Sequence, residues 1–240
     1  VYLDAVFFPR LTPQVLQQEG WHYELDAPDG ALSFKGVVYN EMKGAYSSPD
    51  SVLAEQSQQA LYPDNTYGVD SGGNPRHIPD LTYAQFVDFH RNHYHPSNAR
   101  IFFYGDDDPT ERLKLLDAYL GEFEPSDVDT SVALQPRFDE PRRLVRTYAG
   151  TEAAGEKKAM VTVNWMLDEI TDTETDLGLG ILSYVLLGTP ASPLRKALID
   201  SGLGEDVTGG GLIDALRQMM FSVGLKGIDV ADADAVEALI

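Results

Sequence analysis

The histidines are the residues best suited to bind a metal in this sequence, and three of the five, His90, His93 and His95, lie close together. On a helix, His90 and His93 would share one face, because residues three apart are neighbours there. Two imidazoles so placed could bind a metal ion such as zinc. They could equally pack or cap near the end of a helix, since neither His-Glu-x-x-His nor His-x-x-Glu-His occurs in the sequence. The spacing leaves both interpretations open.

Glu41 is a carboxylate in a segment, from Phe34 to Tyr46, that is otherwise rich in apolar and small residues. If a helix buries this segment, the carboxylate must be paired, protonated or bound to a metal, because an unpaired buried charge is very costly. An ion pair with Lys35 or Lys43, or plain exposure to solvent, would account for it as well. Spacing alone does not decide among these alternatives.

Other catalytic chemistries find little support. The sequence has no cysteine, so thiol nucleophiles, disulfides and cysteine-ligated metals are excluded. It also lacks a Gly-x-Ser-x-Gly elbow, a Walker phosphate loop and a Gly-x-Gly-x-x-Gly motif between a strand and a helix. Three glycines follow Thr208, at 209–211, and we expect a flexible turn there.

The formal net charge of −20 at pH 7 limits the class of partner. Nucleic acid and anionic membrane surfaces are negatively charged, so we expect neither as a partner. Basic ligands would be attracted, although acidity also keeps proteins in solution. Hydrophobic residues make up 43% and charged residues 23%, which is typical of a globular protein. No apolar run approaches the length of a membrane span.

The first half of the chain shows mainly helix signals, which would position Glu41 and the histidines. Capping residues before proline, a capping box and helical spacing of apolar residues carry these predictions. The elements expected are a helix from Leu32 or Gly36 to Tyr46, a helix from the Ser48 cap to about Ala60, a long loop at 61–80, a helix from Thr82 to about Tyr94, a strand at 99–104 and a helix from Asp108 to about Leu120.

A stretch with scattered proline, aspartate and serine, at 126–141, indicates a linker between two domains, 1–125 and 142–240. In the second domain we expect strands at 144–148, 159–165 and 219–225, and helices at 172–187 and 193–200. Helices and strands occur in both parts, so the sequence predicts an α+β fold class. Val1 to Pro9 reads as the end of a helix and Asp232 to Ile240 as the start of one, so we expect the first domain to lack its N-terminal part and the second to be truncated at its C-terminus.

Several sequence blocks, in order along nearly the whole chain, resemble the presequence protease branch of the insulinase-like (M16) metallopeptidases. Each block alone is weak, but together they are highly specific. They are Gly36-Val-Val-Tyr-Asn-Glu-Met-Lys-Gly-Ala-Tyr46, Ser71-Gly-Gly-Asn-Pro75, Phe89-His-Arg-Asn-His-Tyr-His-Pro-Ser-Asn-Ala-Arg100, Tyr104-Gly-Asp106, Leu167-Asp-Glu-Ile-Thr-Asp-Thr173, Ser192-Pro-Leu-Arg-Lys-Ala-Leu-Ile199 and Phe221-Ser-Val-Gly-Leu-Lys-Gly227.

The resemblance implies two homologous insulinase-like metallopeptidase domains, each a sheet covered by helices. It also implies a zinc ion held by two histidines of a His-x-x-Glu-His motif and by a later glutamate, with the motif glutamate as general base. That later glutamate maps onto Glu41, the third zinc ligand. Because the motif does not occur in these 240 residues, we expect the chain to carry only this ligand and to be inactive by itself.

The function implied by the resemblance is that of a zinc-dependent metalloendopeptidase that degrades short unstructured peptides of the targeting-peptide type. Its partners would then be unstructured and possibly basic peptides. A non-catalytic peptide-binding or processing-partner member of the same fold is the alternative. Family members work in bacterial cytoplasm and in the organelle matrix, and the sequence does not choose between these compartments.

Overall fold

The computed structural model describes residues 1–149, 159–170 and 172–240. By contacts between residues, the chain divides into two compact units. Unit 1 consists of Val1–Met42 and Asn74–Ser131, and unit 2 consists of Lys43–Gly73 and Val132–Ile240.

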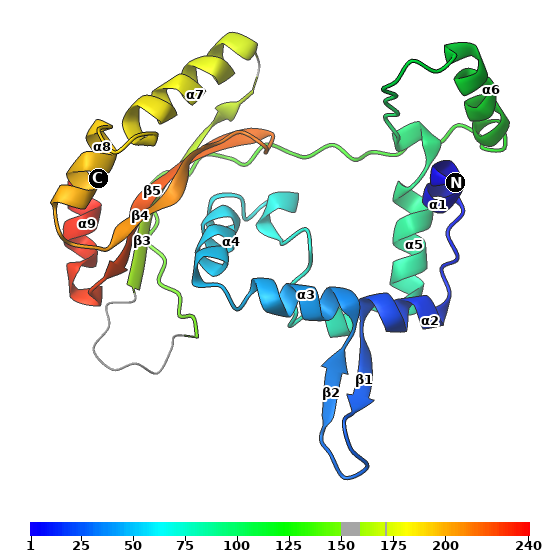
Figure 1. The fold of residues 1–240 in the computed structure, drawn as a ribbon, viewed down its shortest axis with the longest axis horizontal. Coiled ribbons are helices and arrows are strands. Elements are labelled where there is room, and N and C mark those ends of the chain that lie inside the picture. The colour runs from blue at the N-terminus through cyan, green and yellow to red at the C-terminus, as the bar shows by residue number, and fades with distance from the viewer. Residues whose placement is uncertain (150–158, 171) are drawn as a thin grey trace. The chain divides into compact units, whose positions relative to one another are not determined.

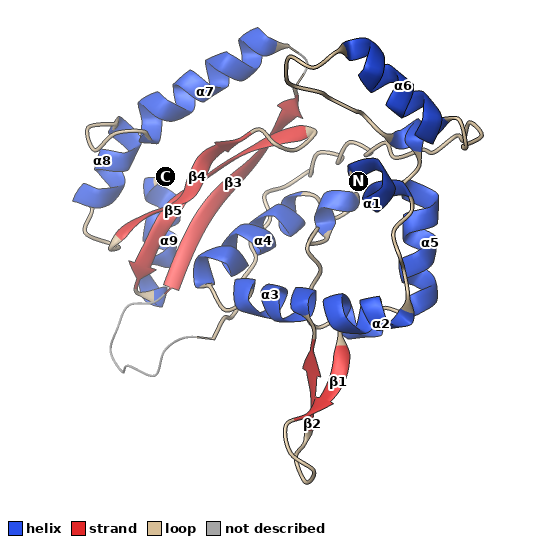
Figure 2. Ribbon diagram, turned by 45° about the vertical axis from the view of Figure 1, so that its right-hand side comes forward, coloured by secondary structure: helices blue, strands red, loops and turns tan. Residues whose placement is uncertain are grey.

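The described residues form helices and antiparallel strands, drawn in Figures 1 and 2. The helices are α1 (Tyr2–Phe7), α2 (Pro13–Val15), α3 (Val37–Ala45), α4 (Pro49–Leu61), α5 (Tyr83–His93), α6 (Pro109–Leu120), α7 (Thr173–Leu187), α8 (Pro193–Asp200) and α9 (Ala233–Leu239). The strands are β1 (His22–Leu25), β2 (Leu32–Lys35), β3 (Ala159–Glu169), β4 (Asp206–Ile213) and β5 (Gln218–Ile228). A π-helical turn spans Leu16–Gly20, and short 3₁₀ turns span Thr66–Gly68, Ile78–Asp80, Pro96–Asn98 and Val230–Asp232.

Unit 1 is mainly helical, with one antiparallel hairpin of β1 and β2. Aromatic packing joins its first helix to the segment after α6, because the Phe7 and Phe8 rings lie 5.6 and 5.4 Å from the Phe123 ring. Hydrogen bonds to main-chain carbonyls fix α5 to the N-terminal segment: Tyr83 Oη donates to Leu11 O at 2.5 Å and His90 Nε2 to Val6 O at 2.8 Å.

Unit 2 is built on a three-stranded antiparallel sheet in the order β3-β5-β4. The central strand β5 buries Val223, Leu225 and Ile228 against Leu198 of α8 and Val236 of α9. Residues that alternate with these, such as Ser222, point to the opposite face, because successive side chains of a strand face opposite ways. Helix α4 covers that opposite face, and the two layers of helices on either side of the sheet can be followed in Figures 1 and 2.

Helix starts that carry a local signal are where the sequence predicts them. The Ser48 side chain accepts a hydrogen bond from Ser51 N at the start of α4. Thr82 and Gln85 form both bonds of a capping box at the start of α5, and Asp108 caps α6. The predicted strand at 159–165 lies within β3, the one at 219–225 lies within β5, and the predicted helices at 172–187 and 193–200 match α7 and α8.

Two predicted strands are wrong, and so is the predicted turn. Residues 99–104 and 144–148 form no strand, since no described strand pairs with either segment, and a ladder requires a partner. The glycines at 209–211 lie inside β4 instead of a turn, where they form a bulge: Thr208 pairs with Gly224 and Gly211 with Ser222, so two residues are skipped. Leu32 to Lys35, offered as a possible helix start, is strand β2, and the first helix begins at Val37 after Gly36.

The predicted domains 1–125 and 142–240 concern homologous repeats, whereas the two units are clusters of contacts within this chain. The domain boundaries therefore stay a prediction. Among the described residues, no helix combines the length and apolar character needed to cross a membrane.

Candidate functional site

Helix α3 carries Glu41, and the glycine that precedes the helix sets its start. Gly36 has φ +143°, a conformation that other residues rarely adopt. A Cβ at this position would lie 2.2 Å from Gly20 O, so the chain passes too close here for any side chain. Asn40 N then donates to Gly36 O at 3.0 Å and closes the first turn. Glu41 follows directly on this fixed helix start.

Glu41 is exposed on α3, and no residue of this helix is fully buried. Of the alternatives left open by the sequence, an ion pair with Lys35 is disfavoured because Lys35 Nζ lies 3.4 Å from Asp26 and 3.7 Å from Glu24. Within the described part of the chain, no ion pair joins Glu41 to Lys43 either. Glu41 is therefore an exposed carboxylate on a rigid element.

The three clustered histidines do not converge on one point. His90 stacks on Tyr94 with ring centroids 4.8 Å apart, and His93 packs on Phe89 at 4.6 Å. His95 accepts a hydrogen bond from Ser97 N at 3.1 Å and caps the following turn. Each ring thus has a packing or capping role near the end of α5, as the second interpretation of their spacing predicts.

No group of three or more metal-ligating side chains comes together among residues 1–149, 159–170 and 172–240. Zinc in catalytic sites takes three protein ligands of nitrogen, oxygen or sulfur type. The described residues do not make such a site by themselves. Glu41 could serve as one carboxylate ligand of such a site, because its side chain is exposed and lies on a helix.

Tyr46, Glu55 and Asp70 form an acidic cluster in unit 2, and no local pattern in the sequence predicts it. Burial, followed by the nearby Asp70 and Glu55 carboxylates, raises the pKa of Tyr46 to about 12. Burial is also the main reason the pKa of Glu55 is raised, and the charge of Asp70 adds to it. A weak hydrogen bond from Gln59 Nε2, at 3.5 Å, partly opposes this shift. Burial in the first place, and the like charge of Asp70 in the second, therefore destabilise the ionised form of Glu55.

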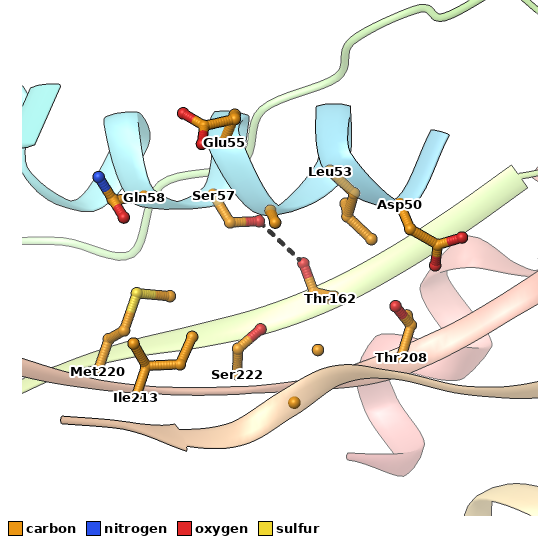
Figure 3. Close-up of a pocket in the computed structure, with 13 residues that line it drawn as sticks. Asp50, Leu53, Glu55, Ser57, Gln58, Thr162, Thr208, Ile213, Met220 and Ser222 are labelled. Atoms are coloured by element: carbon orange, nitrogen blue, oxygen red, sulfur yellow. Dashed lines mark hydrogen bonds between the residues drawn. The ribbon is translucent and has the colours of Figure 1, made fainter. Parts of the chain in front are cut away.

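A cavity of about 210 Å³ lies between α4 and the sheet of unit 2 (Figure 3). Four hydroxyls line it, and Ser57 Oγ and Thr162 Oγ1 are 3.3 Å apart across it. Leu53, Ile213 and Met220 supply an apolar part of the wall. The four hydroxyl residues are Ser57, Thr162, Thr208 and Ser222.

This cavity can hold a small group by hydrogen bonds, but it lacks the parts for nucleophilic catalysis. No histidine is among the described residues that line it, so none of its hydroxyls has an imidazole base there. At one end Lys226 Nζ contacts the Asp50 carboxylate at 3.2 Å, which neutralises that charge. Sequence reasoning missed the cavity because its walls come from α4 and from strands more than a hundred positions later.

Comparisons with known proteins place these features in a family. The family described as Peptidase M16 inactive domain matches residues 80–240. Presequence protease 1, chloroplastic/mitochondrial, of Arabidopsis thaliana is 55% identical over 100% of this chain and 23% of its own length. Protein HypA of Clostridium perfringens is 41% identical over 96% of this chain and 24% of its own length.

Solved structures show the same fold. A protease from Helicobacter pylori superimposes with a TM-score of 0.64 over 85% of this chain and 49% of its own, at 19% identity. The chain spans about a quarter of the length of the curated relatives that it matches, 23% of the first and 24% of the second. Its mixture of helices and antiparallel sheet agrees with the predicted α+β class. With a family match that covers most of its residues, this chain belongs to the M16 peptidase family.

Proposed function

We propose that this chain is part of a zinc-dependent metalloendopeptidase that degrades short unstructured peptides, such as cleaved targeting peptides. In this proposal Glu41 is the third zinc ligand, and two histidines and a general-base glutamate come from a His-x-x-Glu-His motif elsewhere in the protein. The two-domain arrangement, with domains at 1–125 and 142–240, is part of the same proposal.

The observation that carries the proposal is the position of Glu41. It lies in the block Asn40-Glu41-Met42-Lys43-Gly44, on a helix whose start Gly36 fixes, and its carboxylate is exposed. The similarity of the whole of this chain to 23% of a protein named presequence protease supports both the peptidase activity and the substrate class. A degenerate copy of the fold would have no reason to keep this carboxylate.

Zinc bound by two imidazoles and one carboxylate keeps a net positive charge and acidifies a bound water. The part of this chain is to hold one ligand in place: a helix is a more rigid platform than a loop, and no competing ion pair within the described residues neutralises Glu41. The relatives' names indicate organelles for some members and a bacterium for another, so both compartments are compatible with the proposal.

The test is a peptidase assay on the full-length protein. We expect cleavage of a quenched unstructured peptide, loss of cleavage with a zinc chelator and recovery when zinc is added back. The proposal also predicts that the 240-residue chain alone shows neither cleavage nor stoichiometric zinc, since one carboxylate is too few ligands. Cleavage by the isolated chain that a chelator abolishes would contradict the assignment of Glu41 as its only ligand.

A second candidate function is a non-catalytic peptide-binding or processing-partner member of the same fold. The family description of residues 80–240 as an inactive domain favours it. Under this alternative the full-length protein binds the same peptide without cleaving it, with or without zinc. The chelator experiment therefore separates the two candidates directly.

A further inference from the structure

The cavity between α4 and the sheet, drawn in Figure 3, is formed entirely by residues of unit 2. Its lining residues come from α4 and from all three strands of the sheet. The cavity volume of about 210 Å³ lies below the roughly 300–1,000 Å³ of pockets that hold drug-sized molecules. A ligand of this cavity is therefore small, about the size of a single sugar ring.

Two of the hydroxyls that line the cavity have no hydrogen-bond partner among the described residues. Ser222 of β5 is only 3% exposed, yet its Oγ bonds to no described residue. The same is true of Thr208 Oγ1 in β4. Both hydroxyls point from the sheet toward α4 in Figure 3. Because a buried hydroxyl without a partner costs free energy, a molecule that bonds to these two groups is favoured in the cavity.

The other two hydroxyls contact each other and can still bond to a ligand. Thr162 Oγ1 accepts a hydrogen bond from Asn164 Nδ2 at 3.0 Å and lies 3.3 Å from Ser57 Oγ. A hydroxyl carries one hydrogen and two lone pairs, so the Ser57–Thr162 pair keeps a free hydrogen as well as free lone pairs. Gln58 Nε2 donates to Tyr67 O at 3.2 Å, which leaves the Gln58 Oε1 atom as a further acceptor. The wall thus offers both donors and acceptors.

The rest of the wall is apolar or has no side chain. Leu53 of α4, Ile213 of β4 and Met220 of β5 line the cavity. Gly209 and Gly210, at the bulge of β4, form part of the wall with backbone alone. A ligand here contacts hydroxyls and apolar side chains at once. A sugar ring or a cyclic polyol has the matching pattern, because its hydroxyl groups surround an apolar ring of C–H groups.

The charges beside the cavity favour a neutral ligand. Asp50 lies at one end, and its two carboxylate oxygens are 3.2 and 3.5 Å from Lys226 Nζ. Glu55 also lines the cavity, but its carboxylate points away from the sheet in Figure 3. Among the described lining residues, none carries a positive charge. An anion would therefore lack a counter-charge, and a cation would have to compete with Lys226 for Asp50.

We propose that this cavity binds a small neutral polyol, either a monosaccharide or a cyclic polyol of similar size. The ligand hydroxyls bond to Thr208 and Ser222, which have no other described partner, and to the Ser57–Thr162 pair. The C–H face of the ligand packs on Met220 and buries apolar surface that water alone would leave wet. The inference goes beyond the proposed peptidase function and does not rest on it, because the site includes neither Glu41 nor any histidine.

The experiment measures the binding of glucose to the full-length protein by saturation-transfer NMR, and a titration gives the dissociation constant. Glucuronate and glucosamine have the same ring with a negative and a positive charge, so they serve as charge controls. We expect a saturable glucose signal. We also expect glucose to bind at least about tenfold more tightly than either charged sugar, because burial of an unpaired charge is unfavourable.

The double variant Thr208→Val, Ser222→Ala removes the two hydroxyls that lack a described partner. We expect it to bind glucose about tenfold more weakly, because two hydrogen bonds to the ligand are lost. Its melting temperature without sugar should not fall, since no hydrogen bond between described residues is broken. Thr208→Val alone keeps the shape of the side chain and should weaken binding about threefold. The matched control is Thr147→Val, at an exposed threonine of unit 2 outside the cavity, and it should leave the affinity unchanged.

The absence of a saturable glucose signal would overturn the inference and leave the cavity to water. Equal affinity of the double variant and the Thr147→Val control would also overturn it, because the sugar would then bind elsewhere on the protein. Equal binding of glucose and the two charged sugars would contradict the choice of a neutral ligand. If the double variant melts at a lower temperature, Thr208→Val decides, and an affinity equal to that of the control would overturn the inference.

Discussion

Two glutamates of this chain, Glu41 and Glu55, differ in their burial and in the charges beside them. Glu41 is exposed on α3, whereas Glu55 of α4 is partly buried beside Asp70. The sequence pointed to Glu41 through its neighbours in a recognisable block. It gave no sign of the Glu55–Asp70 contact, because the two residues are joined only when the loop after α4 folds back onto the helix.

Replacing Asp70 with asparagine should stabilise unit 2 near neutral pH. The folded pKa of Glu55 is raised above its ordinary value of 4.5, so its ionisation opposes folding. This penalty is absent below the ordinary pKa and reaches its full size once the pH exceeds the raised pKa. Removing the Asp70 charge makes the ionisation of Glu55 less unfavourable in the folded state. Asparagine keeps a side-chain oxygen that can accept the hydrogen bond from Gly72 N.

We expect Asp70→Asn to raise the melting temperature of the chain by about 1–2 °C at pH 7, a small effect because both groups are partly exposed. At pH 4 the difference should vanish. The control is Asp214→Asn, an exposed aspartate of the same unit, which should show no such pH dependence. A variant that is less stable than the parent chain at pH 7 would show that the Asp70 charge contributes favourably instead.

Among the helices and strands, local sequence signals predicted where helices begin. They did not predict which segments pair as strands over long distances in the sequence. Ser48, Thr82 and Asp108 cap helices where the sequence places them, because a cap is formed by residues within one turn. The extended segment 99–104 has strong strand propensity but no described partner, and β propensity alone does not make a ladder. The hairpin of β1 and β2 is not among the predicted elements, because the sequence offers Leu32, in β2, as a possible helix start and no element at β1.

The bulge in β4 was also missed, and its two unpaired glycines should respond differently to substitution. Gly209 has φ +108°, and a Cβ there would lie 2.7 Å from the backbone of Ser222 in β5. Gly210 has φ +87°, but a Cβ there would meet open space. Gly210→Ala should therefore cost about 1–2 kcal/mol of backbone strain. Gly209→Ala should cost clearly more, because β4 and β5 must move apart.

Denaturant unfolding of the two alanine variants and the parent chain measures this difference in the free energy of unfolding. Equal losses at the two positions would mean that only the positive φ matters and that the close approach of β4 to β5 does not. The outcome also bears on the cavity, since Gly210 lines it. An alanine methyl there would have no other heavy atom within 4 Å.

For the whole molecule, the net charge of −20 is the property with the clearest functional consequence. If the acidic surface attracts basic peptides, the attraction is screened over about 8–10 Å at physiological salt. For the full-length protein, kcat/KM for a basic peptide should then fall steeply as ionic strength rises. A neutral peptide of equal length serves as the control, because steps that do not depend on the charge of the peptide affect both peptides alike. The same salt dependence for both would assign the acidity to another role.

The family assignment came from several blocks spread over nearly the whole chain, and neither composition nor periodicity could have provided it. The fold class was predictable because helix and strand signals alternate along the sequence. For the metal site the sequence predicts one residue, Glu41, and this stays a proposal, since the described residues contain no group of three or more metal-ligating side chains. The cavity under α4 and the acidic cluster depend on tertiary contacts that a single sequence does not encode in local patterns.

The most direct test of Glu41 as a zinc ligand is the zinc content of the full-length protein carrying Glu41→Gln. Glutamine keeps the size of the side chain but removes its charge, so we expect the protein to fold normally, lose bound zinc and cleave peptides more than about a hundredfold more slowly. Glu122→Gln, at another exposed glutamate of unit 1, is the matched control and should keep full zinc and normal activity. A Glu41→Gln protein with stoichiometric zinc and a near-normal rate would contradict the assignment.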